Sequence, residues 1–255
     1  MGKIEINSQI AEIIGMFAVD GCLQPKYVCI WGNINQDQKY YDNVVCPLFS
    51  SVFKKKIVAH EKKSNSVYGF YLCGKNAVDF FKRYGFKVGN KTYIVTVPKI
   101  ILNSKNPILY SSFIRGFADC DGFLNFVRRK QHSSPFHQSF NTYPRIYCVS
   151  VSKRLILDIS YMLTKLNIKH AVETRRVGNS KKNKVDAFVV AIRGIDRLEE
   201  WIKTIGFKNP TQFTKYLVWK RYGFCPPNTT FKDREEMLAG NLNPNPFYKS
   251  GPDRI

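Results

Sequence analysis

The chain has 255 residues, a length that allows one or two domains with a substantial buried core. Its 40 Lys and Arg outnumber 19 Asp and Glu, for a formal net charge of +21. Such an excess favours a polyanionic partner, most commonly nucleic acid. Seven cysteines without C-x-x-C spacing exclude a zinc ribbon and a disulfide framework. Without an apolar run of membrane-spanning length or a signal core, we expect an intracellular protein (cytoplasm or organelle) that is not secreted and binds no membrane.

The most informative feature is an internal repeat. Residues 13–21 and 114–122 are apolar stretches in which a glycine is followed five residues later by Asp-Gly, at an offset of 101 residues. A Gly-Phe-Lys triplet recurs at 85–87 and 206–208. Two halves of one design are therefore expected. The predicted division is a first half at 1–98, a linker with the start of the second motif helix at 99–106, a second half at 107–224 and a tail at 225–255.

Hydrophobic periodicity gives the expected elements in chain order. In the first half these are a helix ending at Asp-Gly, strands over 22–26 and 27–33, a helix over 37–53, strands over 57–63 and 67–73, and a helix over 76–84. A short helix is expected after Pro98. The second half repeats the order, with strands over 123–129 and 145–152, a helix over 153–166, strands over 170–176 and 187–193, and a helix over 197–205.

This order predicts an α+β fold with two pseudo-symmetric αββαββα halves, each with a four-stranded antiparallel sheet. The segment after residue 224 opens with Pro226-Pro227 and is rich in Asn and Pro. We expect it to be extended, or partly ordered against the body.

Small residues recur along one face of each motif helix, which lets two helix backbones approach closely. They are Ala11, Gly15 and Ala18 in the first helix and Ser112, Gly116 and Asp119 in the second. We expect the two helices to pack on each other, with their C-terminal ends side by side. The glycines after the motif aspartates suit a left-handed C-cap.

Packing of this kind makes Asp20 and Asp121 neighbours. A carboxylate at a helix C-terminus is unfavourable because the macrodipole is negative there, and two adjacent carboxylates are worse. A divalent cation removes the conflict, and hard oxygen ligands favour Mg²⁺. Metal ions between an attacking water and a leaving oxygen serve phosphodiester cleavage.

The duplicated Gly and Asp-Gly positions resemble the motif of the LAGLIDADG homing endonucleases, in their single-chain, monomeric form with two motifs, over about residues 8–224. Ala18 departs from the acidic residue that is frequent two places before the last aspartate, whereas Asp119 keeps it. The resemblance implies an intron-encoded enzyme that hydrolyses both strands of a double-stranded DNA site of roughly twenty base pairs. It implies recognition through the major groove by a saddle of two sheets, 3′ overhangs and no obligate protein partner.

Metal ligands follow from the same resemblance. It implies Asp20 and Asp121, with the adjoining Gly21 and Gly122, as the divalent-metal site. Mg²⁺ or Mn²⁺ is expected to support cleavage, and Ca²⁺ to bind without supporting it.

Family members also use a polar residue near the end of the second strand of each half, and a lysine before the end of each half. Candidates for the polar residue are Asn35, Gln36, Ser152 and Lys153. Candidates for the lysine are Lys91, Lys99, Lys208 and Lys215. The alternative for each lysine is a solvated surface residue or a phosphate contact.

Side chains on one face of each sheet are expected to contact DNA, with Arg suited to guanine and Asn or Gln to adenine. Because strand side chains alternate, about half of any such set points away. The candidates are Gln24, Lys26, Tyr27, Trp31, Asn33, Lys63, Tyr68, Asn125, Arg128, Arg129, Arg145, Tyr147, Arg175, Arg176, Lys181 and Lys184.

Two alternatives use the same scaffold without cleaving DNA: a maturase that acts on intron RNA, and a non-cleaving DNA-binding regulator. Retention of both motif aspartates favours the endonuclease.

Overall fold

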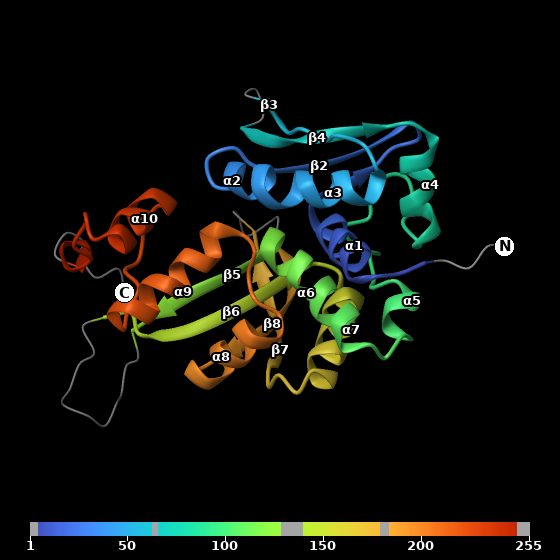
Figure 1. Ribbon diagram of the computed structural model, residues 1–255. Helices are drawn as coiled ribbons and strands as arrows, with labels where there is room; N and C mark the ends of the chain where they lie inside the picture. The colour runs from blue at the N-terminus through green and yellow to red at the C-terminus, as the bar shows by residue number, and fades with distance from the viewer. Residues whose placement is uncertain (1–4, 63–65, 129–139, 179–183, 249–255) are drawn as a thin grey trace.

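The computed structural model describes residues 5–62, 66–128, 140–178 and 184–248 (Figure 1). The first half contains α1 (Ser8–Asp20), β1 (Gly21–Leu23), β2 (Tyr27–Asn33), α2 (Gln38–Tyr40), η1 (Tyr41–Val45), α3 (Cys46–Phe53), β3 (His60–Lys62), β4 (Val67–Cys73) and α4 (Lys75–Arg83). After α5 (Lys99–Leu102), the second half contains α6 (Pro107–Asp121), β5 (Gly122–Val127), β6 (Tyr143–Ser150), α7 (Lys153–Lys165), β7 (Ala171–Val177), β8 (Val185–Arg193) and α8 (Ile195–Thr204). The predicted order of elements is confirmed in both halves.

Each half forms a four-stranded antiparallel sheet, in the order β1-β2-β4-β3 and β5-β6-β8-β7. The equal order confirms the expected α+β fold with pseudo-symmetric halves. Alternation along the strands gives each sheet one face for the core, which carries residues such as Val28 and Ile30 in the first half and Ile146 and Cys148 in the second. Helices α3 and α4 cover this face in the first half, and α7 and α8 cover it in the second (Figure 1).

The motif helices α1 and α6 lie side by side between the two halves (Figure 1). The backbones are so close that a Cβ added at Gly15 would lie 2.1 Å from the carbonyl oxygen of Phe113. A Cβ at Gly116 would lie 2.1 Å from the carbonyl oxygen of Glu12. The two contacts are equivalent under the repeat: Gly15 corresponds to Gly116, and Glu12 corresponds to Phe113. The predicted helix pair is therefore confirmed, with glycine at its two points of closest approach.

The expected left-handed C-caps are wrong. Gly21 has φ −76° and ψ 145°, and Gly122 has φ −87° and ψ 160°, both extended. The requirement for glycine is one of space: a Cβ at Gly21 would lie 2.0 Å from the ring of Phe17, and one at Gly122 would lie 2.7 Å from the carbonyl oxygen of Ala118. The chain passes directly from helix into strand, which fixes the direction of the preceding aspartate.

Two further helices were not expected. Helix α9 (Pro210–Tyr222) begins at the N-cap Asn209 and ends at Gly223, which has φ 77°. Helix α10 (Phe231–Ala239) begins with a capping box formed by Thr230 and Asp233. The described part of the tail is thus ordered but helical, because the Pro-rich segment only precedes a well-capped helix. The helix expected over 37–53 is also interrupted, by the π-helical turn η1.

The core is continuous across the two halves. One cluster of buried side chains includes Phe17 of α1, Phe70 of β4, Phe117 of α6 and Ile159 of α7. A common core fixes the relative position of the two sheets. Within the described residues, no helix has the length and apolar character needed to cross a bilayer.

Candidate active site

The two motif aspartates line one cavity of about 550 Å³ at the C-terminal ends of α1 and α6. Its lining includes Trp31, Gly32 and Asn33 at the end of β2 in the first sheet. It also includes Gly122 and Phe123 at the start of β5 in the second sheet. The cavity therefore lies where the two sheets meet, and the predicted juxtaposition of Asp20 and Asp121 holds. Its remaining lining residues are Gln36, Asp37, Ser66, Val67, Asp119, Cys120, Asn209, Thr211 and Gln212.

Burial makes the ionised form of both aspartates unfavourable. It raises the pKa of Asp20 to about 7, and the negative charge of Asp121 contributes to this increase. Burial likewise raises the pKa of Asp121 to about 6. Such a pair is stabilised by a cation that takes the place of the missing solvent.

Lys91 is a cation that lies beside this pair. Its Nζ donates hydrogen bonds to the carbonyl oxygens of Ala18 (3.0 Å) and Val19 (2.8 Å) at the end of α1. The position is favourable because carbonyls at a helix C-terminus lack backbone donors. Burial lowers the pKa of Lys91, while the charges of Asp20 and Asp121 oppose that shift.

A further carboxylate, Asp37, lines the same cavity and was not predicted from the sequence. Its Oδ2 accepts a hydrogen bond from the backbone N–H of Asn33 (2.7 Å). Its Oδ1 accepts one from the side chain of Asn209 (3.2 Å). Burial raises the pKa of Asp37, and its negative charge adds to the raised pKa of Asp20. The only signal in the sequence is its position in the turn that follows the second strand.

Asn209 connects the two halves at this point. Its Nδ2 also donates to the carbonyl oxygen of Asp119 (2.9 Å), and its Oδ1 accepts from the backbone N–H of Thr211 (2.9 Å) as the N-cap of α9. The hydroxyl of Thr211 donates to the carbonyl oxygen of Gln36 (2.8 Å). One buried amide thus joins the turn after β2, the end of α6 and the start of α9.

We expect Asn209→Ala to lower the free energy of unfolding by about 2 to 4 kcal/mol, since it removes a helix cap and leaves buried acceptors without donors. Asn106→Ala is the matched control: Asn106 caps α6 through the backbone N–H of Ile108 at an exposed position. It should cost about 1 kcal/mol. Urea unfolding of both variants measures the difference. Equal losses would mean that the contacts between the halves contribute nothing.

The donor set fits a divalent ion with few protein ligands. No group of three or more His, Cys, Asp or Glu side chains within the described part of the chain is arranged to hold a metal. A site with two carboxylates leaves positions for water and phosphate, as is usual for Mg²⁺. Of the two predicted glycines, Gly122 lines the cavity, whereas Gly21, which directly follows Asp20, is not among its lining residues.

The predicted polar residues are divided between the cavity and other places. Gln36 lines the cavity, and Asn35 lies in the same turn but outside the lining. Ser152 is buried as the N-cap of α7 and donates to the carbonyl oxygen of Val95 (2.7 Å), away from both aspartates. Lys153 lies over the ring of Phe188. In the second half Gln212, which the sequence analysis missed, lines the cavity instead.

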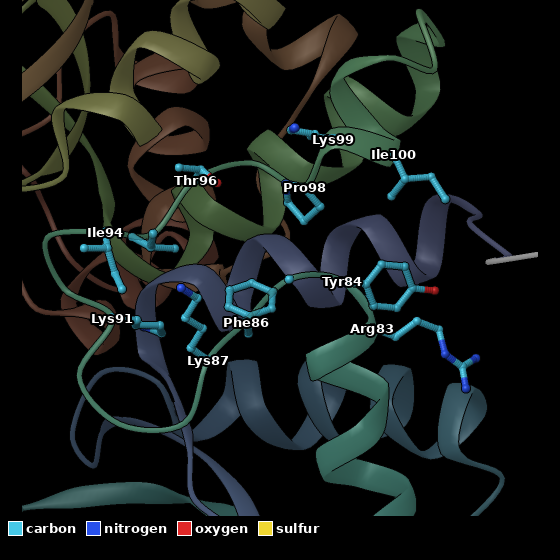
Figure 2. A pocket seen from close by; sticks show the side chains of 12 residues that line it. Arg83, Tyr84, Phe86, Lys87, Lys91, Ile94, Thr96, Pro98, Lys99 and Ile100 are labelled. Carbon is cyan, nitrogen blue, oxygen red and sulfur yellow. The ribbon is translucent and has the colours of Figure 1, made fainter. Parts of the chain in front are cut away.

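Of the four predicted lysines, Lys91 is the one whose amino group lies at the end of a motif helix. Lys208 forms an ion pair with the buried Glu12 at 2.9 Å, while its backbone N–H donates to Asp119. Lys99 lies at the start of α5, beside a separate pocket of about 590 Å³ whose lining includes Lys91 (Figure 2). Lys215 lies on α9, where its Nζ donates to the carbonyl oxygen of Leu124 at 3.1 Å.

Because side chains alternate along a strand, the predicted DNA-contacting residues of the first sheet divide between its open face and its helix-covered face. Tyr27, Trp31 and Asn33 share the face of β2 opposite to the core residues Val28 and Ile30. The ring of Trp31 packs on His60 and Tyr71 of the same sheet. The prediction that Tyr68 contacts DNA is wrong. Tyr68 is buried on the helix-covered side, and its hydroxyl donates to Asp42 of η1 (2.8 Å). Gln24 and Lys26 lie in the turn between β1 and β2.

In the second sheet, Asn125 pairs with Arg145, and Phe123 pairs with Tyr147, so all four share the open face. Arg175 belongs to the same face, with its guanidinium 4.6 Å from the ring centroid of Tyr147. Arg176, its neighbour in the strand, points to the other face and pairs with Asp186 at 3.5 Å. The prediction that Arg176 contacts DNA is therefore wrong.

The open face also holds residues that the sequence analysis missed. Glu173 forms ion pairs with Arg175 and Arg193 on this face. Arg128 and Lys184 flank the strands, and the guanidinium of Arg128 lies 5.7 Å from the ring centroid of Tyr248. Lys63, Arg129 and Lys181 lie outside the described residues.

Comparison with known proteins gives a sequence relative and a fold. The chain is 25% identical over 174 residues to a subunit of the A-type ATP synthase of Pyrococcus abyssi; the match covers 68% of this chain and 15% of that protein. The chain thus spans only a small part of the length of that relative. No protein-family model matches the chain.

Among solved structures, the LAGLIDADG homing endonuclease I-LtrWI bound to target DNA superposes with a TM-score of 0.54 at 12% identity, covering 97% of this chain and 99% of that one. The meganuclease I-SmaMI bound to DNA gives 0.52 at 9% identity, covering 95% and 98%. Both matches extend over the two sheets and the paired helices. Together with the duplicated motif and the two antiparallel sheets, they show that this chain has the fold of the single-chain LAGLIDADG homing endonucleases.

Proposed function

We propose that the chain is a metal-dependent, site-specific endonuclease that cleaves both strands of a long DNA duplex. The observation that supports this most strongly is the pair Asp20 and Asp121, which line one cavity between the two sheets. The repeat supplies one carboxylate from each half, an arrangement that suits cleavage of two opposite strands. A net charge of +21 favours binding of a polyanion.

The open sheet faces provide a surface that suits base recognition. Asn125 and Arg145 stand side by side across β5 and β6, and Tyr27 and Trp31 lie on the open face of β2. These faces adjoin the cavity, so a duplex held on them brings its backbone to the aspartates. We propose major-groove contacts from these residues, cleavage across the minor groove, and short 3′ overhangs. I-LtrWI and I-SmaMI, which share the fold, have been solved bound to DNA.

The residues of the cavity, together with Lys91 of the neighbouring pocket, have separate chemical roles. Asp20 and Asp121, with the adjoining Gly21 and Gly122, would hold Mg²⁺ or Mn²⁺. A bound ion supplies charge neutralisation and lowers the pKa of water next to the scissile phosphate. Gln36 in the first half and Gln212 in the second present amide groups that orient water or phosphate oxygens. Lys91 places a positive charge beside the carboxylates, where negative charge develops on the phosphate in the transition state. Such an enzyme acts inside the cell, where its DNA lies.

The decisive experiment incubates the protein with a library of long duplexes in Mg²⁺, Mn²⁺ or Ca²⁺ and sequences the cut ends. We expect one preferred site, cut on both strands with Mg²⁺ or Mn²⁺ and bound without cleavage in Ca²⁺. Tight, salt-dependent binding of DNA or intron RNA with no cleavage in any metal would refute the endonuclease. It would favour a maturase or a DNA-binding regulator.

Lys91→Met should lower the cleavage rate by about a hundredfold at saturating DNA, because a positive charge is lost where charge develops in the transition state. DNA affinity should change little, since Lys91 is largely buried and donates to the end of α1. Lys99→Met, in the same neighbouring pocket, is the control (Figure 2). Single-turnover cleavage separates the rate from binding. Equal rates for the two variants would remove Lys91 from the reaction.

A further inference from the structure

Two positively charged side chains lie close together between helices α9 and α10. Arg234 of α10 is only 1% exposed, and Lys215 of α9 is largely buried beside it. Buried charges are ordinarily paired with a charge of opposite sign, because desolvation without a counter-ion is costly.

Neutral groups are the hydrogen-bond acceptors of both side chains. Arg234 donates to the hydroxyl of Thr214 (3.1 Å), to the carbonyl and hydroxyl oxygens of Thr229, and to the carbonyl oxygen of Thr211 (3.1 Å). Lys215 donates to the carbonyl oxygen of Leu124 (3.1 Å) and to the amide oxygen of Gln212 (3.3 Å). Within the described residues, these contacts leave at least one N–H of each side chain unused and give neither positive charge a counter-charge.

Among the described residues, no nearby acidic group forms an ion pair with either cation. The charge of Asp233 attracts the neighbouring Arg234, but its carboxylate accepts from the backbone N–H of Thr230 in the capping box (2.7 Å). Cys225 lies beside the two cations, and burial raises the pKa of its thiol to about 11. The thiol is therefore neutral near pH 7.

A cavity of about 160 Å³ opens between these two cations. A water molecule occupies about 30 Å³ in the liquid, so this space holds several waters or one tetrahedral oxyanion. No carboxylate is among its lining residues, which are Asn125, Phe126, Lys215, Cys225, Pro226, Pro227, Asn228, Thr229 and Arg234. The side chains of Asn125 and Asn228 add amide groups to the lining, whereas the hydroxyl of Thr229 already donates to the carbonyl oxygen of Pro226 (3.3 Å).

A purely structural role explains only part of this arrangement. The bonds of Arg234 to Thr211 and Thr214 hold α10 against α9, a task that needs one guanidinium. Lys215 adds a second positive charge to the same low-dielectric space. Burial and the charge of Arg234 lower the pKa of Lys215 to about 8, the direction expected for an amino group without an anionic partner.

We propose that the cavity between β5, α9 and α10 is an anion site in which Lys215 and Arg234 bind a phosphate group. Its ligand is a tetrahedral oxyanion, either free inorganic phosphate or a backbone phosphate of bound DNA. Asn125, on the open face of β5, joins this cavity to the surface proposed to face DNA. The site is distinct from the cavity of Asp20 and Asp121, with which it shares no lining residue.

Inorganic phosphate is the first probe, with sodium chloride of equal ionic strength as reference. On the full chain, phosphate should raise the melting temperature by on the order of 5 °C at about a hundredfold excess over its Kd. Lys215→Met should abolish this response, and Lys215→Arg should retain it. Lys232→Met is the control, an exposed lysine of α10. Arg234→Met should also lose the response; if it does not fold, Lys215→Met still decides. Equal responses to phosphate and chloride, or equal responses of the wild type and Lys215→Met, would overturn the site.

A second arm identifies the source of the phosphate and alone rests on the proposed DNA binding. It uses a random-sequence duplex without divalent metal, so it is independent of cleavage. If the site takes a DNA phosphate, saturating duplex removes the response to inorganic phosphate, and Lys215→Met lowers the slope of log Kd against log salt by about one. If it takes free phosphate, the response persists in the complex and the slope is unchanged. A protein without nuclease activity that keeps the phosphate response would separate this inference from the proposed function.

Discussion

Asp20→Asn and Asp121→Asn are each expected to abolish double-strand cleavage, with a loss on the order of a thousandfold or more in rate. Each substitution keeps the shape of the side chain and removes one of the two motif carboxylates that line the cavity. A supercoiled plasmid with the preferred site distinguishes linear, nicked and uncut products. Asp186→Asn is the control, because Asp186 is exposed and pairs with Arg176 on the side of the second sheet opposite to the open face. A linear product from either motif variant at the wild-type rate would refute the assignment.

The same substitutions should change how stability depends on pH in metal-free protein. The pKa of Asp20 is about 7 in the folded chain, above the unfolded value of about 4. The folded state therefore binds the proton more tightly. The contribution of Asp20 to stability is fully present below about pH 4 and is lost as the pH rises towards about 7.

Asp20→Asn removes this contribution, so the difference in unfolding free energy between variant and wild type should grow in favour of the variant as the pH rises. Urea unfolding with a chelator, from acid to neutral pH, measures it. Comparison with the wild type cancels other acids, such as Glu173, whose pKa is lowered by Arg193 and Arg175. Adding Mg²⁺ at neutral pH should stabilise the wild type more than the variant. A difference that does not depend on pH would contradict the burial of an ionised Asp20.

Gly15→Ala is expected to lower the free energy of unfolding by about 3 kcal/mol or more, because overpacked cores respond with backbone shifts. The new methyl group would lie 2.1 Å from the carbonyl oxygen of Phe113, a backbone atom that cannot move independently of α6. The melting temperature should fall by about 6 to 12 °C. Gly116→Ala, whose methyl group would meet the carbonyl oxygen of Glu12, should behave alike.

Cleavage should fall with stability in these variants, since separating the helices moves Asp20 away from Asp121. Gln9→Ala is the control, an exposed position of the same helix that changes helix propensity without touching α6. Calorimetry and the plasmid assay measure both effects. If Gly15→Ala were as stable as Gln9→Ala, the close contact of α1 and α6 would contribute nothing to the free energy of unfolding.

The elements that depend on local periodicity and on the repeat could be predicted from the sequence alone. Alternating and helical patterns predicted the order of strands and helices in each half, because these periods follow from backbone geometry. Gly15 and Gly116 predicted close packing of the motif helices, because a residue without a side chain lets two helix backbones approach each other. The duplication at a fixed offset predicted that Asp20 and Asp121 share a site.

The other residues of the site depend on contacts between distant parts of the chain. Asp37 and Asn209 are 172 positions apart, and nothing local in either segment indicates that they meet. The register of β4 placed Tyr68 against the helices, because a shift of one residue exchanges the two faces of a strand. Lys91 rather than Lys99 lies beside the aspartates because the chain folds back along α1. Arg234 is buried next to Lys215 through the docking of α10 on α9, and sequence alone predicts neither that contact nor the cavity it leaves.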